Sequence, residues 1–137
     1  MDILDKLKAL EYFVDNEYLL KYAQLVGTRR AAGNRHTLTN KHHIVPRSWY
    51  KLMGKEVDNS RTNLITLTYR EHVMAHYYLC LCTRDNLKYA NELALIGLAN
   101  RKCLSDIDRQ LVKNLPLYNN IYESYVKHRK SNYQLYR

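Results

Sequence analysis

In the stretch NLITLTYREHVMAH, which runs from Asn63 to His76, the spacing of hydrophobic residues changes from a strand-like to a helix-like pattern. This change restricts the fold more than any other feature of the sequence. Its first six residues form a short apolar and β-branched run, which predicts a strand. Thr68 is followed three residues later by Glu71, the spacing of a capping box, in which both side chains satisfy backbone donors at a helix start. We therefore predict a helix that begins at Tyr69, directly after the strand.

The predicted helix carries two histidines, His72 and His76. Residues four apart on a helix are separated by about 40° around its axis, so both imidazoles project from one face toward a common point. Two ring nitrogens placed in this way can chelate a metal ion. Such a pair is, on its own, more often incidental than metal-binding, so the interpretation needs further ligands.

Upstream, the stretch KHHIVPRSWY places two adjacent histidines, His42 and His43, before an apolar pair and a proline. The Ile-Val pair is β-branched and is stopped by Pro46, which predicts a very short strand at residues 44–45. We expect this strand to pair with the strand of residues 63–68 as a hairpin.

The rest of the sequence predicts a mostly helical chain. Apolar residues recur at steps of three and four between residues 2 and 26, which predicts one or two amphipathic helices closed by Gly27. Residues 28–41 predict a loop, and further helices are expected to begin near Asp85 and Pro116. With 137 residues, the chain is expected to be a single α+β domain, mostly helical, with a two-stranded hairpin. Its expected parts are an N-terminal helical segment and basic loop at 1–37, a strand and helix unit at 38–82, and C-terminal helices at 83–137.

Charge indicates a polyanionic partner. The chain has 22 Lys and Arg against 13 Asp and Glu, a formal net charge of +9. From Gly27 to Lys55 there is no acidic residue, which is typical of a surface that faces phosphates. A second basic run follows Glu123, and for that run alone a solvated helix face is the preferred interpretation. The basic residues of the first run are Arg29, Arg30, Arg35, Lys41, Arg47, Lys51 and Lys55.

Cysteine usage and hydropathy favour a cytoplasmic protein. Cys80, Cys82 and Cys103 form an odd set without C-x-x-C spacing, so we expect reduced, mostly buried thiols with no disulfide framework. The N-terminus lacks a signal-peptide pattern, and no stretch approaches the roughly 18 apolar residues of a membrane span. No membrane partner is expected.

In order along the chain, HHIVPRS, NLITLT and REHVMAH resemble the HNH nuclease motif of the ββα-metal fold, especially the small stand-alone HNH endonucleases of phages and mobile elements. The resemblance covers roughly residues 38–80 and depends on the order of the motifs as well as on their residues. It implies that His42, His72 and His76 ligate a metal ion and that His43 is the general base. Asn63 matches the central asparagine, which ties the loop and holds the base in place.

Two features qualify the match. The insert between Pro46 and Asn63 lacks the Gly-Gly pair often seen in phage members, which leaves the loop geometry open. Neighbours on a regular strand face opposite sides. We therefore expect irregular backbone from Lys41 to His43, so that one imidazole meets the metal and the other meets water.

The resemblance implies hydrolysis of DNA phosphodiester bonds, with 5′-phosphate and 3′-hydroxyl products. Histidine, whose ordinary pKa is about 6.5, can take a proton from water near neutral pH. One divalent ion would supply Lewis acidity. Family use and cellular abundance place Mg²⁺ first, whereas imidazole ligands suit Zn²⁺, Ni²⁺ or Co²⁺, and Mn²⁺ is a further choice. The expected contacts to DNA, most simply double-stranded, are Arg29, Arg30, Arg35, Lys41, Arg47 and Arg70.

Other interpretations stay open at this stage. The same chemistry could act on RNA, and a metal-stabilised DNA-binding module without catalysis is a third hypothesis. His43 argues against that module, because a structural metal site needs no base beside its ligand. Trp49, in the basic region, suits a DNA contact and a packing role equally. A phage-encoded homing, packaging or DNA-attack enzyme in the host cytoplasm fits each nuclease reading, and the sequence makes no prediction of oligomeric state.

Overall fold

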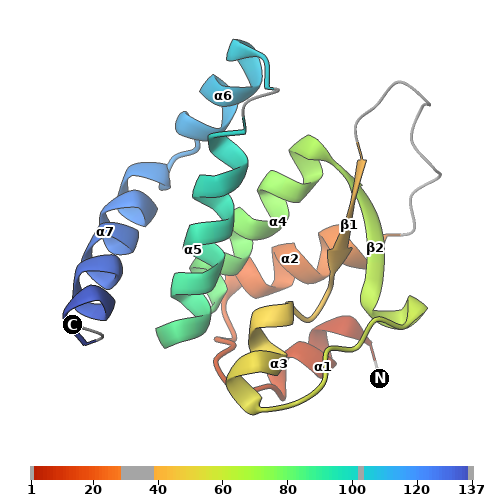
Figure 1. Cartoon of the computed structure of the whole chain (residues 1–137). Coiled ribbons are helices and arrows are strands. Elements are labelled where there is room, and N and C mark those ends of the chain that lie inside the picture. The colour runs from red at the N-terminus through yellow and green to blue at the C-terminus, as the bar shows by residue number, and fades with distance from the viewer. Residues whose placement is uncertain (1, 29–38, 102–103, 136–137) are drawn as a thin grey trace.

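The structure, a computed structural model, describes residues 2–28, 39–101 and 104–135, with side chains described up to residue 130 (Figure 1). Within these ranges, no helix combines the length and the apolar character needed to cross a bilayer. The elements, in chain order, are α1 (Ile3–Lys8), α2 (Glu17–Gly27), β1 (Thr39–His43), α3 (Arg47–Met53), the 3₁₀ turn η1 (Arg61–Asn63), β2 (Leu64–Thr68), α4 (Tyr69–Cys82), α5 (Asp85–Ala99), α6 (Asp106–Lys113) and α7 (Tyr118–Leu135).

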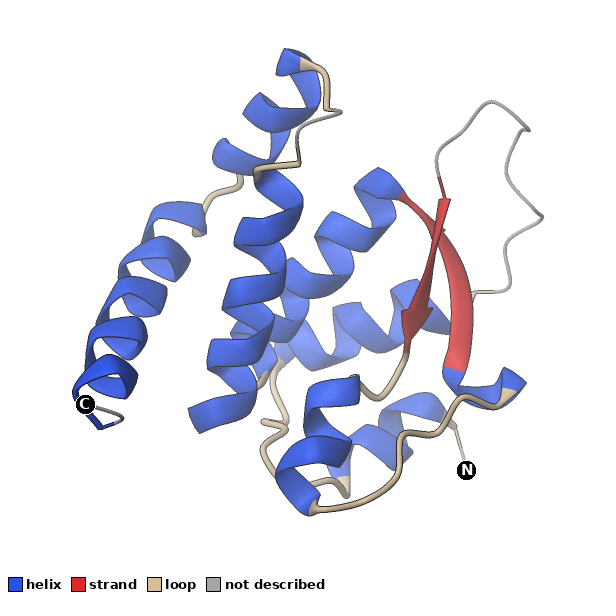
Figure 2. Ribbon diagram, in the orientation of Figure 1, coloured by secondary structure: helices blue, strands red, loops and turns tan. Residues whose placement is uncertain are grey.

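The described chain is mostly helical with one antiparallel two-stranded sheet, as predicted (Figure 2). Strand β1 pairs with β2 so that His42 lies opposite Ile65. Helix α4 begins at Tyr69, directly after β2, and the predicted capping box is present. The Glu71 amide donates to Thr68 Oγ1 at 3.2 Å, and the Thr68 amide donates to a Glu71 carboxylate oxygen at 2.8 Å.

The first strand lies earlier in the chain than predicted. The strand prediction at Ile44 and Val45 was wrong, because β1 occupies Thr39–His43, part of which was predicted to be loop. Ile44 and Val45 follow the strand and are buried in the core, so their apolar character reflects packing and not strand pairing. The irregular backbone expected from Lys41 to His43 is also absent, because all three residues belong to the regular strand.

Two helices were missed and one helix end was misplaced. Residues 47–53 form α3, which buries Trp49 and ends at Gly54 in the left-handed region, with φ of 67°. From the sequence, Pro46 served only to end the predicted strand, yet proline also fits a helix start, where no amide hydrogen is needed. Helix α6 was also missed. Gly27, predicted to follow the first helical segment, is instead the last residue of α2, which is ended by the extended backbone of Thr28.

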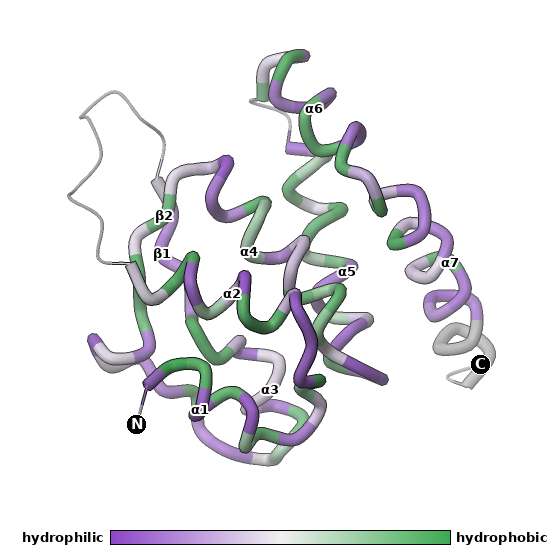
Figure 3. Tube along the Cα trace, turned by 180° about the vertical axis from the view of Figure 1, so that it is seen from behind, coloured by the Kyte–Doolittle hydropathy of each residue, from purple (hydrophilic) through white to green (hydrophobic). Residues whose placement is uncertain are grey.

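Helix α4 lies between two groups of buried side chains. One group joins α4 to α1, α2, α3 and the sheet, and includes Leu19, Leu67 and Leu79. The other joins α4 to α5, α6 and α7, and includes Leu95 and Ile121. Figure 1 shows α4 with α2 and α5 beside it and α7 outermost. Figure 3 shows hydrophobic and hydrophilic residues alternating along the helices, as expected where each helix buries one face.

Asn63 joins the end of β1 to the start of β2. Its fully buried amide oxygen accepts from the Val45 amide at 2.8 Å, and its Nδ2 donates to the carbonyl oxygens of Asp58 at 2.8 Å and Val45 at 3.3 Å. Its own carbonyl oxygen accepts from the Ile44 amide at 2.9 Å. One side chain therefore holds both the segment that leaves β1 and the loop that precedes β2.

Replacing Asn63 with Ala should lower the free energy of unfolding by about 2–4 kcal/mol, because the buried backbone groups it serves would lose their partners. The measurement is urea unfolding followed by circular dichroism. Asn114→Ala, at an exposed helix end, is the matched control and should change stability by less than about 1 kcal/mol. Equal stability of the two variants would contradict the role assigned to Asn63.

Candidate metal centre

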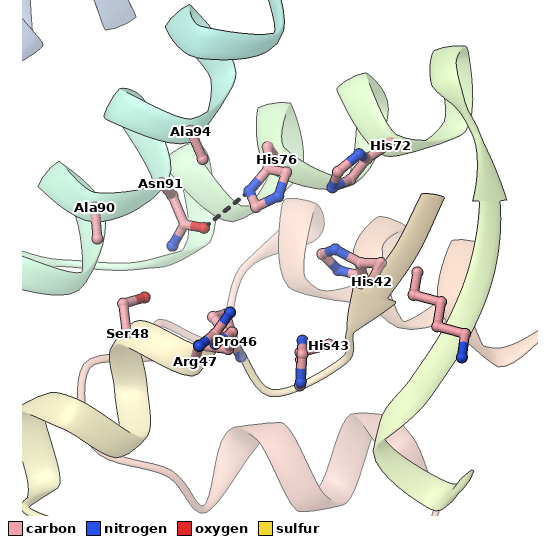
Figure 4. A pocket seen from close by; sticks show the side chains of 11 residues that line it. His42, His43, Pro46, Arg47, Ser48, His72, His76, Ala90, Asn91 and Ala94 are labelled. Carbon is pink, nitrogen blue, oxygen red and sulfur yellow. Dashed lines mark hydrogen bonds between the residues drawn. The ribbon is translucent and has the colours of Figure 1, made fainter. Parts of the chain in front are cut away.

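Three histidines from two elements converge at one point. His42 comes from β1, and His72 and His76 come from α4. One ring nitrogen from each residue lies within 4.8 Å of the others, and the ring centroids are 5.3, 5.1 and 4.9 Å apart in the three pairs. Figure 4 shows the three rings grouped together, with His43 apart from them at the end of the strand. These side chains are close enough to bind a metal ion.

The ring of His42 is oriented by Tyr22 of α2. The Tyr22 hydroxyl donates its proton to the Ile44 carbonyl oxygen at 2.7 Å. At its 2.8 Å contact with His42 Nε2, the hydroxyl oxygen must therefore accept, so His42 carries its proton on Nε2. This leaves the lone pair of Nδ1 available for a metal ion.

The other two rings are oriented by asparagines. His72 Nδ1 lies 3.3 Å from Asn40 Oδ1, and His76 Nδ1 lies 3.2 Å from Asn91 Oδ1. An amide oxygen only accepts, so both histidines carry the proton on Nδ1 and keep a lone pair on Nε2.

Further contacts fix which way each amide points. Asn91 Nδ2 donates to the Leu87 carbonyl oxygen at 3.0 Å. Asn40 Oδ1 also faces a guanidinium nitrogen of Arg101 at 3.3 Å, and a guanidinium only donates. All three imidazoles thus have the arrangement of metal ligands whose second nitrogen is held by an outer hydrogen bond.

Burial keeps these imidazoles neutral. It lowers the pKa of His42 well below its ordinary value, with smaller effects from the neighbouring histidines. It lowers the pKa of His72 to about 4, with a contribution from Arg101, and the pKa of His76 to about 4, with a contribution from His72. A neutral ring is the form that offers a lone pair to a metal ion.

The donor set fits a divalent ion held by nitrogen ligands. Among the residues that the structure describes, no carboxylate or thiolate joins the cluster. Three protein ligands leave coordination positions open, which is typical of catalytic and not of structural metal sites.

A cavity of about 210 Å³ is lined by the three clustered histidines and by His43. His43 Nε2 lies 2.7 Å from Asn59 Oδ1, which only accepts, so the lone pair of His43 is on Nδ1. Lys41 and Arg47 also line the cavity. Its full lining is Lys41, His42, His43, Pro46, Arg47, Ser48, His72, His76, Ala90, Asn91 and Ala94.

Other predicted DNA contacts lie elsewhere. Arg70 forms an ion pair with Asp108 at 3.4 Å and lines a separate hollow between α4 and α6. Arg29, Arg30 and Arg35 fall outside the described residues.

Trp49 is buried, and its indole N–H donates to the Glu11 carbonyl oxygen at 3.0 Å, which favours the packing role. Cys80 and Cys82 are buried free thiols, as expected, whereas Cys103 lies outside the described residues. His128 is partly exposed and contacts the fully buried carboxylate of Glu92 at 3.0 Å.

Sequence reasoning missed the residues that orient the site. Tyr22 and Asn91 lie on helices outside the motif, and Asn40, Asn59 and Arg101 lie in segments read as loop or helix end. None of them has a spacing to the histidines that marks it in the sequence. Their roles depend on packing between elements far apart in the chain.

Comparisons with known protein families, curated protein sequences and solved structures gave no significant match to this chain.

Stability of the metal-free protein should fall as the pH drops from about 6.5 to about 4. In this window unfolded histidines bind protons, whereas His72 and His76 in the fold, with pKa values lowered to about 4, do not. The stabilisation is complete above the unfolded pKa and is lost as the pH falls through the folded pKa. Urea unfolding in EDTA at pH 7 and pH 4.5 should differ by on the order of 3 kcal/mol.

His76→Gln removes one of the histidines with a lowered pKa and should show a smaller change of stability with pH. His128→Gln, outside the cluster, is the control and should retain the full change. A pH dependence that is the same in both variants would contradict the assignment.

Proposed function

We propose that the protein is a metal-dependent endonuclease that hydrolyses phosphodiester bonds of DNA. The observation that carries the proposal is a fourth imidazole, His43, that lines the same cavity as the three clustered histidines and keeps a ring nitrogen free of hydrogen bonds to the described chain. A structural metal site has no need of such a group. Two cationic side chains, Lys41 and Arg47, line the cavity and suit a phosphate.

The arrangement supports a division of roles. His42, His72 and His76 would hold the metal ion, which supplies Lewis acidity toward the charge that develops on phosphate. His43 Nδ1 would take a proton from the attacking water, because its Nε2–H is engaged by Asn59. We interpret β1, β2 and α4 as the ββα-metal unit that the sequence resemblance implies.

Asn63 supports the proposed base through the loop before β2. Its Nδ2 donates to the carbonyl oxygen of Asp58, the residue next to Asn59. The Asp58 carboxylate accepts from the Ser60 amide at 2.9 Å, which tightens the turn around Asn59. Asn63 therefore acts as a positioning residue that fixes the loop whose amide orients His43.

The ligand chemistry leads us to propose Zn²⁺, Ni²⁺ or Co²⁺ as the tightest-binding ions. Mg²⁺, which the family resemblance places first, prefers oxygen ligands, and so does Mn²⁺, whereas the cluster offers three imidazole nitrogens.

Calorimetric titration should therefore show one Zn²⁺, Ni²⁺ or Co²⁺ per chain, with Kd at least about 100-fold below that of Mg²⁺. His76→Ala should weaken binding by at least about 10-fold, whereas His128→Ala, outside the cluster, should not change it. Equal weakening by both variants would contradict the assigned ligands, and Mg²⁺ binding as tight as Zn²⁺ would contradict the preference.

Replacing His43 with Ala should lower the rate of plasmid cleavage by about 10²–10⁴-fold, because the water would lose its proton acceptor. Metal affinity and DNA affinity should stay within about twofold of wild type, since His43 holds neither partner in this scheme. The assay is nicking of supercoiled plasmid with Zn²⁺, Ni²⁺, Co²⁺, Mn²⁺ or Mg²⁺, with EDTA as the blank and His128→Ala as the matched histidine control.

A structured RNA in parallel reactions separates the two nucleic-acid substrates. Cleavage of RNA alone would reassign the substrate. If the wild-type protein cleaves neither substrate with any of these ions, the nuclease proposal is wrong and a metal-stabilised binding module replaces it. Undiminished cleavage by the His43 variant would contradict only the assignment of His43 as the general base.

A further inference from the structure

Arg101 is held one hydrogen bond away from a proposed metal ligand. It follows the end of α5, is partly buried, and donates from Nη1 to Asn40 Oδ1 at 3.3 Å. The same oxygen accepts from His72 Nδ1 at 3.3 Å. The Arg101 carbonyl oxygen accepts from Arg109 Nη2 at 3.1 Å, which anchors the backbone of this segment to α6. The backbone of Arg101 is therefore anchored to α6, and its guanidinium is hydrogen-bonded beside the cluster.

This guanidinium lacks a carboxylate partner within the described part of the chain, where no Asp or Glu lies within 4.0 Å of its nitrogens. Some of the other described arginines do have such partners. Arg70 pairs with Asp108, and Arg84 pairs with Glu11 and Asp85. A partly buried charge without a counter-charge is costly, so its position calls for an explanation.

The position of Arg101 beside the histidine cluster makes this electrostatic cost larger. The positive charge of Arg101 contributes to the lowered pKa of His72, because it opposes a second positive charge on that ring. The same repulsion opposes a divalent cation at the cluster. An anion that contacts both Arg101 and the bound cation would replace this repulsion with attraction.

We propose that Arg101 binds a backbone phosphate of the nucleic-acid strand, next to the phosphate held at the histidine cluster. This inference rests on the proposed function. Arg101 reaches the Nδ1 side of His72 through Asn40, and Nε2 is the ring nitrogen left for a metal ion, so the guanidinium is placed for a flanking phosphate. One of its five N–H groups engages Asn40, and the planar fork of the others matches phosphate oxygens.

A structural role for Arg101 predicts a different outcome in metal binding. If Arg101 served only to hold Asn40, its loss would loosen His72 and weaken metal affinity. If Arg101 binds an anion, replacing it removes a charge that repels the metal ion, so metal affinity should be unchanged or higher. The sign of the change in metal affinity therefore separates the two roles.

The test uses the full chain with His43→Ala, so that the substrate stays intact, loaded with Zn²⁺ and mixed with a fluorescent DNA duplex of about 20 base pairs. Adding Arg101→Gln should weaken binding about 10-fold in low salt and lower the slope of log K against log salt by about one. The duplex affinity of Arg101→Lys should lie between those of the parent and Arg101→Gln, since lysine keeps the charge but lacks the planar fork of N–H groups. Arg84→Gln, whose ion pairs lie outside the cavity, is the control and should match the parent.

Two results would overturn the inference. One is a duplex affinity and salt slope for Arg101→Gln equal to those of Arg84→Gln, and the other is a loss of Zn²⁺ affinity in Arg101→Gln. Both can occur while the wild-type protein cleaves DNA, in which case the proposed function survives. Failure of the wild-type protein to cleave any substrate, with the expected Arg101 effects on binding, would instead overturn the nuclease proposal and keep the phosphate contact.

Discussion

The centre depends on one kind of interaction, a hydrogen bond from each clustered imidazole to an uncharged oxygen. Tyr22, Asn40 and Asn91 supply these oxygens from α2, β1 and α5. Since none of the three is a carboxylate, no negative charge draws a second proton onto the rings, and burial keeps them neutral. The cluster is therefore oriented for a cation by one side chain of the hairpin, Asn40, and by two side chains from helices outside it, Tyr22 and Asn91.

Local signals predicted the half of the site that lies on one element. The capping box set the start of α4, and the spacing of His72 and His76 then fixed their common face, because both effects act within one or two turns. The two-stranded sheet was also predicted, but β1 lies earlier than Ile44 and Val45. An apolar β-branched pair signals burial, and burial alone does not separate a strand from the segment that follows it.

Long-range contacts supplied the rest, and no sequence pattern encodes them. Asn40 and Arg101 are 61 positions apart yet share a hydrogen bond. Asn59 and His43 are 16 apart and meet where Asn63 holds the adjoining loop. Basic residues near the motif were natural candidates for phosphate contacts, but Arg70 turns to Asp108, away from the cavity. Proximity in sequence was therefore an uneven guide, because Lys41 and Arg47 do line the cavity whereas Arg70 does not.

Helix α5 joins the centre to the far side of the molecule through two consecutive residues. Asn91 reaches His76 of α4, and the next residue, Glu92, reaches His128 of α7 from a fully buried position. One turn of α5 therefore carries both a contact to the centre and a contact to the C-terminal helix, and the two contacts are made by different side chains.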